Sequence, residues 1–164
     1  MQILNQHQIQ QKLQRLAIEI LERNHREPEI ILAGINSNGM RFAQMLGNEL
    51  RNKSAIPVRL TRIKLSPANP LEKEVVIEMP MDELHDKSII IVDDVANTGR
   101  TLFYAIKPLL SILPKKVEIA VLVDRTHKAF PVQADYVGLS LATTLKEHIE
   151  VRISEEAEMS VYLT

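Results

Sequence analysis

The segment Ile89–Thr101, IIIVDDVANTGRT, constrains the fold more than any other stretch of this chain. Its four β-branched residues predict a buried strand, which runs directly into two adjacent carboxylates, Asp93 and Asp94. The polar turn Asn97-Thr98-Gly99 follows, and then a helical pattern. N–H groups at a helix start bind phosphate, and carboxylates accept hydrogen bonds from sugar hydroxyls. We therefore predict a site for a phosphorylated sugar. The simpler alternative is that one of the acids caps a helix, but a cap would not require two acids.

The composition predicts one globular domain, spanning residues 1–164. A chain of 164 residues can bury one substantial core but is too short for two ordinary domains. Its 20 basic and 21 acidic residues balance, which gives no global charge for binding nucleic acid. Cysteine is absent, which excludes disulfides and thiolate metal sites. No apolar run reaches the roughly 18 residues of a membrane span, and no signal peptide is visible, so we expect a cytoplasmic protein.

Alternating helical and strand patterns predict an α/β fold with a mostly parallel, twisted sheet and helices on both faces. Helices are expected at Gln6–Asn24, through Phe42, Leu46 and Leu50 after a polar loop at 36–39, and from Leu102 through Leu110 toward Pro114. Strands are expected at Ile30–Ala33, Val58–Ile63, Val75–Glu78, Ile89–Asp93 and Val117–Asp124, and near Tyr136, Ile149–Ile153 and Val161. Two prolines make Ser66–Pro70 irregular.

Polar sequence follows three of these strands, at residues 34–39, 93–101 and 124–128. Ligands of open α/β sheets bind beyond the carboxyl ends of the strands. The topology therefore predicts that the three segments converge on one site.

The segment Val92–Thr101, VDDVANTGRT, resembles the phosphoribosyl pyrophosphate (PRPP) signature of the type I phosphoribosyltransferases. Segments Ala120–Gly138, Leu13–Asn24 and Ile30–Gly39 extend the likeness to the PyrR group, pyrimidine operon attenuators that also have uracil phosphoribosyltransferase activity. The resemblance implies a type I phosphoribosyltransferase fold and PRPP-dependent transfer to a nucleobase, with uracil favoured. It also implies Mg2+ as cofactor and a homodimer or larger homo-oligomer.

The resemblance also implies roles for individual residues. Asp93 and Asp94 would be the catalytic pair and hold the ribose hydroxyls. The remaining PRPP contacts would come from Asn97, Thr98, Gly99, Arg100 and Thr101 around the 5′-phosphate, and from Asn36, Ser37, Asn38 and Gly39 in the pyrophosphate loop. On the pyrophosphate and base side lie Val123, Asp124, Arg125 and Arg62, with Asp124 also meeting Mg2+ through water.

Several alternatives stay open for these residues. Arg100 is equally explained as a solvated surface cation, and the loop at 36–39 as a plain strand-to-helix turn that lacks the family's basic residue. A larger residue at Gly99 is expected to harm phosphate binding more than stability, because backbone approaches the ligand there.

The largest departure from the PyrR group is the segment Leu60–Pro70, which is shorter than the flexible lid of those proteins and lacks its paired acids. Lids exclude water, so a trimmed one predicts weaker or altered catalysis. Two alternatives to an enzyme follow. One is an RNA-binding regulator of pyrimidine genes, less favoured because the arginines Arg15, Arg23, Arg26, Arg41 and Arg51 are scattered among acids. The other is a non-catalytic sensor of PRPP or nucleotides.

Overall fold

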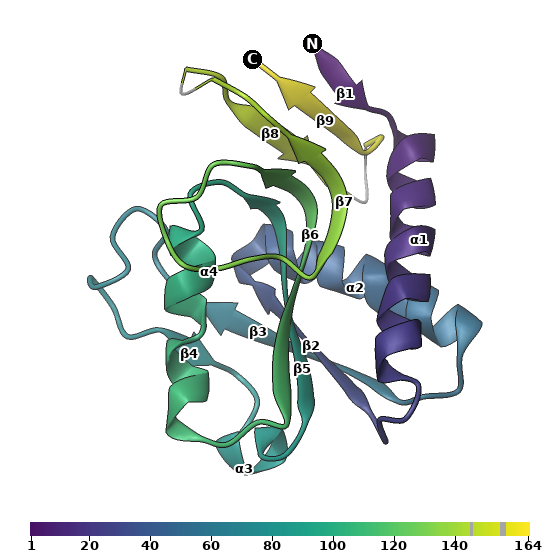
Figure 1. Ribbon diagram of the computed structural model, residues 1–164, viewed down its shortest axis with the longest axis vertical. Coiled ribbons are helices and arrows are strands. Elements are labelled where there is room, and N and C mark those ends of the chain that lie inside the picture. The colour runs from purple at the N-terminus through teal and green to yellow at the C-terminus, as the bar shows by residue number, and fades with distance from the viewer. Residues whose placement is uncertain (145, 155–156) are drawn as a thin grey trace.

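The computed structural model describes residues 1–144, 146–154 and 157–164 and contains two sheets (Figure 1). The larger has six strands in the order β4-β3-β2-β5-β6-β7, and every neighbouring pair is parallel except β3 and β4. Its strands are β2 (Ile30–Ile35), β3 (Val58–Lys64), β4 (Val76–Ile77), β5 (Ser88–Ala96), β6 (Lys116–Arg125) and β7 (Tyr136–Leu141). The predicted mostly parallel sheet is confirmed.

Helices cover both faces of this sheet, as predicted (Figure 1). One face is covered by α1 (Gln6–Asn24) and α2 (Asn36–Lys53), and the other by α3 (Met81–Leu84), α4 (Arg100–Ala105) and the 3-10 helix η1 (Lys107–Ser111). The bounds of α1 match the prediction, because a capping box marks its start: Asn5 and Gln8 exchange side chain–backbone hydrogen bonds of 2.9 Å. None of the described helices is long and apolar enough to cross a membrane.

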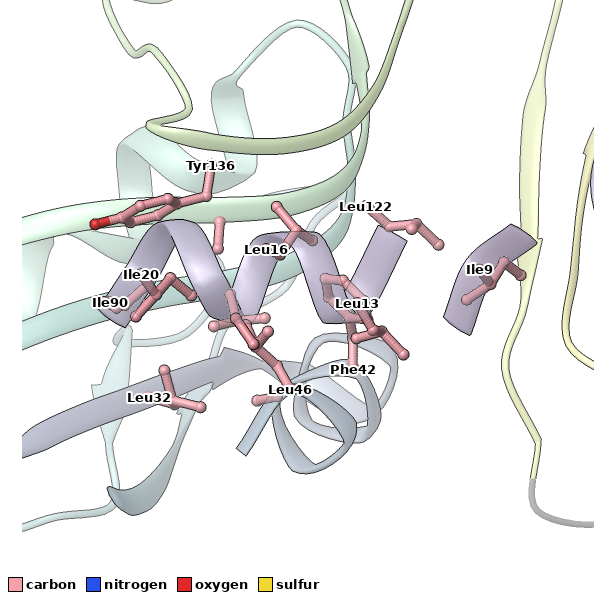
Figure 2. Close-up of a cluster of buried hydrophobic side chains, with 14 of the residues drawn as sticks. Ile9, Leu13, Leu16, Ile20, Leu32, Phe42, Leu46, Ile90, Leu122 and Tyr136 are labelled. Carbon is pink, nitrogen blue, oxygen red and sulfur yellow. The ribbon is translucent and has the colours of Figure 1, made fainter. Parts of the chain in front are cut away.

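Alternate residues along the strands point to opposite faces of the sheet and belong to two separate hydrophobic cores. Ile30 and Leu32 face α1 and α2, whereas Ile31 and Ala33 face α4. Figure 2 shows the first core, where Ile9, Leu13, Leu16 and Ile20 form one stripe along α1 that packs toward Leu32, Phe42, Leu46, Ile90, Leu122 and Tyr136. Strands buried on both faces explain the continuous apolar runs in the sequence.

Two predicted boundaries on the helices are wrong. Residues 36–39 are the first turn of α2 and not a loop, because Asn36 adopts a left-handed conformation (φ 52°) that turns the chain within one residue. The expected helix from Leu102 through Leu110 ends as α4 at Ala105 and continues as η1. Pro108 lacks the N–H that an α-helix requires at that position.

A separate antiparallel sheet of three strands, in the order β1-β9-β8, was not predicted. It consists of β1 (Gln2–Leu4), β8 (Ile149–Arg152) and β9 (Ser160–Leu163), and it lies at the top of Figure 1 beside both chain ends. Strands near Ile149 and Val161 were expected, but the three residues of β1 are too few to show a period. The first residue of β8, Ile149, reaches the site described next.

Candidate active site

A pocket of about 470 Å3 lies at the carboxyl edge of the large sheet. Its lining comes from the start of α2, from the connection after β3, from the end of β5 with the following turn and α4, and from β8. The lining residues are Ile35, Asn36, Ser37, Asn38, Pro67, Asp93, Asp94, Val95, Asn97, Thr101 and Ile149. Two of the three polar strand ends therefore meet as predicted.

A larger hollow of about 560 Å3 lies between α1, α2 and the residues Ile153, Ser154 and Met159. Amide side chains such as Gln14 and Gln44 make up much of its polar lining, and none of the strand-end acids reaches it. Because chemistry needs reactive groups that converge, we assign the active site to the smaller pocket.

The two acids of β5 are held in place by backbone and amide donors. The N–H of Asp94 donates to Asp93 Oδ1 (2.9 Å), and the N–H of Val95 donates to Asp94 Oδ1 (2.8 Å). The second oxygen of Asp94 accepts a hydrogen bond from Asn38 Nδ2 (3.3 Å). Neither carboxylate takes part in an ion pair with any residue that the structure describes.

This arrangement changes the acidity of Asp93, which is only 8% exposed. Burial, and then the neighbouring charge of Asp94, raise the pKa of Asp93 well above its ordinary value. A buried carboxyl group with a perturbed pKa at a pocket is a candidate functional group, for which a ligand can supply the missing partner. Ribose hydroxyls, a metal ion or a developing positive charge would each serve.

Asn36 and Gly39 have structural roles at the start of α2. The side chain of Asn36 pairs with the backbone of Leu65: Nδ2 donates to the carbonyl (2.9 Å) and Oδ1 accepts from the N–H (3.1 Å). A Cβ at Gly39 would approach the carbonyl oxygen of Val92 to 2.7 Å, so glycine permits the close packing of α2 on β5. No local pattern in the sequence indicates the contact between Asn36 and Leu65.

The other two residues of this turn, Ser37 and Asn38, are exposed at the pocket. No side chain caps the helix at this end, in contrast to α1. The first N–H groups of α2 are therefore not satisfied by a side-chain cap, which suits the binding of an anion.

The turn before α4 is shaped by Gly99, whose φ is 88°. A Cβ at this position would lie 2.5 Å from Val132 Cγ2 and 3.3 Å from Lys128 Cδ. The expectation that a larger residue would intrude on a phosphate is therefore wrong, because it would collide with the segment 128–132 instead. The carbonyl of Thr98 ties the turn to that segment by accepting from the N–H groups of Ala129 (2.9 Å) and Phe130 (3.2 Å).

Arg100 is exposed, and its side chain contacts the connection between β3 and β4. Its Nη2 donates to the carbonyl oxygen of Pro67 (2.6 Å) and lies 3.5 Å from that of Ala68. Arg100 is therefore a surface cation, as one of the two alternatives has it, but its guanidinium group also contacts the protein backbone. A direct contact with PRPP stays a prediction. Thr98 and Thr101 flank this residue, and Thr101 lines the pocket.

The third polar strand end lies beside the pocket without lining it. Asp124 is in register with Ala96 of β5 and forms an ion pair with Lys128 Nζ (2.7 Å). That ammonium group also donates to the carbonyl of Asn97 (3.1 Å), so it links this strand end to the turn. No helix connects Asp124 with Lys128, so their spacing in the sequence did not indicate this pair.

Of the remaining predicted residues, Arg125 and Val123 are engaged within the protein. Arg125 donates to the carbonyl of Glu147, and Val123 is fully buried in the core, which leaves only its backbone for a ligand. Arg62 lies on β3 in register with Gly34. Their contacts with pyrophosphate or base stay predictions.

The acids at the pocket fit a magnesium ion that arrives with its substrate. The residues described in the structure contain no cluster of three or more Asp, Glu, His or Cys side chains that could enclose a metal. Mg2+ is commonly bound through one or two carboxylates, substrate phosphates and water, which matches Asp93 and Asp94. The predicted role of Asp124 would compete with its ion pair to Lys128.

Comparison with known proteins identifies the family. The sequence model of the phosphoribosyl transferase domain family matches residues 1–156. The chain belongs to this family. It is 34% identical to the bifunctional protein PyrR of Bacillus pumilus, covering 93% of this chain and 90% of that protein. It is 38% identical to PyrR of Streptococcus uberis, over 86% of this chain and 83% of the relative. The predicted family is confirmed.

Solved structures confirm the predicted fold. The hypoxanthine phosphoribosyltransferase of Trypanosoma cruzi matches with a TM-score of 0.71 at 19% identity, over 85% of this chain and 81% of that one. A hypoxanthine-guanine phosphoribosyltransferase from Bacillus anthracis matches with a TM-score of 0.70 at 22% identity, over 86% and 82% of the two chains.

Proposed function

We propose that this protein transfers the phosphoribosyl group of PRPP to a nucleobase, with uracil as the favoured base, and releases pyrophosphate. The observation that carries the proposal is the carboxylate pair Asp93 and Asp94, which has no basic partner among the residues that the structure describes and faces a pocket at the end of the central strand. The choice of uracil rests on the resemblance to PyrR proteins.

In this reaction the bond from C1 of the ribose to pyrophosphate breaks and a bond to a base nitrogen forms. Positive charge develops on the ribose ring between these events. The carboxylates of Asp93 and Asp94 would accept hydrogen bonds from the ribose hydroxyls and stabilise that charge. Because both are held by fixed donors, they require little reorganisation as the charge appears.

The phosphate groups would be held by the two turns that border the pocket. Backbone N–H groups of residues 97–101 and the hydroxyls of Thr98 and Thr101 suit the 5′-phosphate. The N–H groups at the start of α2, near Ser37 and Asn38, suit the pyrophosphate. Mg2+ bound by PRPP together with Asp93 and Asp94 would supply positive charge against the leaving pyrophosphate. This division places the bond that breaks between the two turns.

Release of pyrophosphate from Mg2+–PRPP tests the proposal directly. We expect release with uracil and little with hypoxanthine or guanine, and we expect Asp94→Asn to abolish it. Absence of release with all three bases, together with absence of PRPP binding, would contradict the proposal. Binding of PRPP without release would favour the non-catalytic sensor.

An RNA-binding regulator is the second candidate, because the relatives are described as bifunctional. Three of the five arginines considered for RNA binding contact their own chain. Arg23 lies over the ring of Tyr136, Arg41 donates to the carbonyl of Ile153, and Arg51 donates to that of Val58. This engagement disfavours a free basic surface on the single chain.

We therefore expect weak binding of a pyrimidine leader RNA at physiological salt. Titration at several salt concentrations measures the number of neutralised phosphates Z, since the log–log slope is about −0.7Z to −0.9Z. A nanomolar complex with a steep slope would place the regulatory function first.

A homodimer or larger oligomer is a further part of the proposal. Phe103, Leu110 and Leu113 are 40%, 77% and 75% exposed on α4, η1 and the residues that follow. Large apolar side chains that are exposed to this degree are candidates for an association site. Sedimentation of the wild type and of Leu110→Lys would measure this property.

A further inference from the structure

The connection between β3 and β4, residues 65–75, contains the second half of the segment Leu60–Pro70 that the resemblance predicts to be a trimmed lid. Three buried residues, Leu65, Pro70 and Val75, anchor it to the fold, and the tip at 71–74 is exposed. Pro67 lies between the first two anchors and lines the pocket. We call residues 65–75 the short loop.

Two side chains from the phosphate-binding turns hold the backbone of the short loop. Asn36, at the start of α2, makes its two hydrogen bonds to Leu65. Arg100, at the start of α4, donates to the carbonyl of Pro67 and lies near that of Ala68. The short loop is thus tied to both turns of the pocket in the ligand-free protein.

We propose that Arg100 is a positioning residue for the short loop, so that the loop stands as a fixed wall of the pocket instead of closing over it as a lid. The guanidinium group is planar, permanently charged and carries several donors, which suits the contact with Pro67 and Ala68. Hydrogen bonds from a charged donor are stronger than neutral ones, so the contact fixes an exposed segment. The inference rests on the proposed function only where it concerns PRPP.

A loop that is ordered before the ligand binds lowers the entropic cost of binding. A mobile lid loses conformational freedom when substrate arrives, and that loss weakens binding. The short loop has already lost this freedom through Asn36 and Arg100. A trimmed lid therefore need not lower the affinity for PRPP, although it excludes less water.

Proteolysis of the ligand-free protein tests the positioning role. Lys73 lies in the exposed tip and provides a trypsin site within the short loop. We expect cleavage after Lys73 to be at least about 5-fold faster in Arg100→Gln than in the wild type, and intermediate in Arg100→Lys. Lys107→Gln is the matched control, because Lys107 is an exposed cation on the adjacent η1 whose side chain makes no hydrogen bond or ion pair with the described residues.

A cross-link separates positioning from direct charge. The chain has no cysteine, so Ala68→Cys with Arg100→Cys introduces the only two thiols, which a short bis-maleimide can join. We expect PRPP to bind Arg100→Gln at least about 5-fold more weakly than wild type, and the cross-linked protein to recover to within about 3-fold. The untreated double variant should bind as weakly as Arg100→Gln.

Unchanged cleavage after Lys73 in Arg100→Gln would overturn the proposal, as would a cross-linked protein that binds as weakly as Arg100→Gln. The second result would show that Arg100 acts on PRPP through its charge. If the wild type itself does not bind PRPP, the proposed function fails, whereas the proteolysis of the ligand-free proteins still decides whether Arg100 positions the short loop.

Discussion

At the amino end of the large sheet three glutamates near the strands have basic partners, whereas at the carboxyl end the two acids of β5 have none within the described parts of the chain. Glu27 pairs with Lys115 (3.0 Å) and Glu29 with Lys87 (2.8 Å). Glu118 pairs with Lys116 (3.3 Å) and with Arg23 (3.9 Å). Asp93 and Asp94 depend on N–H donors and on Asn38.

The amino end also buries neutral polar groups with complete partners. Asn24, fully buried, donates to the carbonyl of Ile20 (2.8 Å) and accepts from Ser88 Oγ (2.7 Å). The hydroxyl of Tyr136 donates to Glu118 (2.9 Å). Satisfied groups of this kind stabilise a fold, whereas an uncompensated buried acid lowers stability and is retained where a ligand needs it. We infer from this difference that the polar groups at the amino end stabilise the fold, whereas the acids at the carboxyl end serve the proposed reaction.

The largest expected effect is on turnover. Asp93→Asn or Asp94→Asn should lower it at least about 100-fold, because each removes charge that faces the reacting ribose. The affinity for PRPP, measured by calorimetry, should fall by about 1.5–3 kcal/mol. Asp135→Asn makes the same chemical change at the opposite end, where the carboxylate accepts from the N–H of Ile119 (2.8 Å), and should leave both properties unchanged. Equal losses of turnover and PRPP affinity in Asp135→Asn would contradict the proposed difference between the two ends.

The next effect is on stability at the carboxyl end. Gly99→Val should lower the free energy of unfolding by about 2–3 kcal/mol, because φ is 88° and Val132 occupies the space of the new side chain. Gly47→Ala is the control: this glycine lies within α2, and its added Cβ would meet nothing nearer than 3.5 Å. Urea denaturation should show a gain of about 0.5–1 kcal/mol there. An unchanged free energy of unfolding in Gly99→Val would instead support the predicted role of Gly99 in phosphate binding.

A smaller loss of stability is expected at the amino end. Burial, together with the hydrogen bond to Glu118, raises the pKa of Tyr136, so this hydroxyl remains a donor through neutral pH. Tyr136→Phe should lower the free energy of unfolding by about 1 kcal/mol through loss of that hydrogen bond. Pyrophosphate release should be unaffected. Loss of activity without loss of stability would place chemistry at this end too.

The smallest expected effect is a gain. Asp93→Asn should raise the free energy of unfolding at neutral pH, because a neutral side chain replaces a buried acid. The folded protein holds the proton of Asp93 more tightly than the unfolded chain, since its pKa is raised. Wild-type stability from this group is complete below the ordinary pKa of 3.8 and is lost as pH rises through the raised pKa. The gain should therefore grow with pH in urea titrations, and a gain that shrinks would contradict the assignment.

Local patterns predicted much of this fold but little of the contact network around the site. The apolar stripe of α1 and the apolar run of β5 are local signals, and the structure confirms both predicted elements. The contacts of Asn36 with Leu65 and of Arg100 with Pro67 join residues far apart in sequence. No periodicity encodes such side chain–backbone bonds, because they depend on how the packed elements meet.

The junction between β2 and α2 restricts how the length of this chain can vary. The strand ends at Ile35 and the helix begins at Asn36, so no spare residue separates them. One inserted residue would rotate α2 by about 100° and carry Phe42, Leu46 and Leu50 off the sheet. The exposed tip at 71–74 has no such constraint. Insertions and deletions among related chains should therefore gather in the tip and avoid the junction.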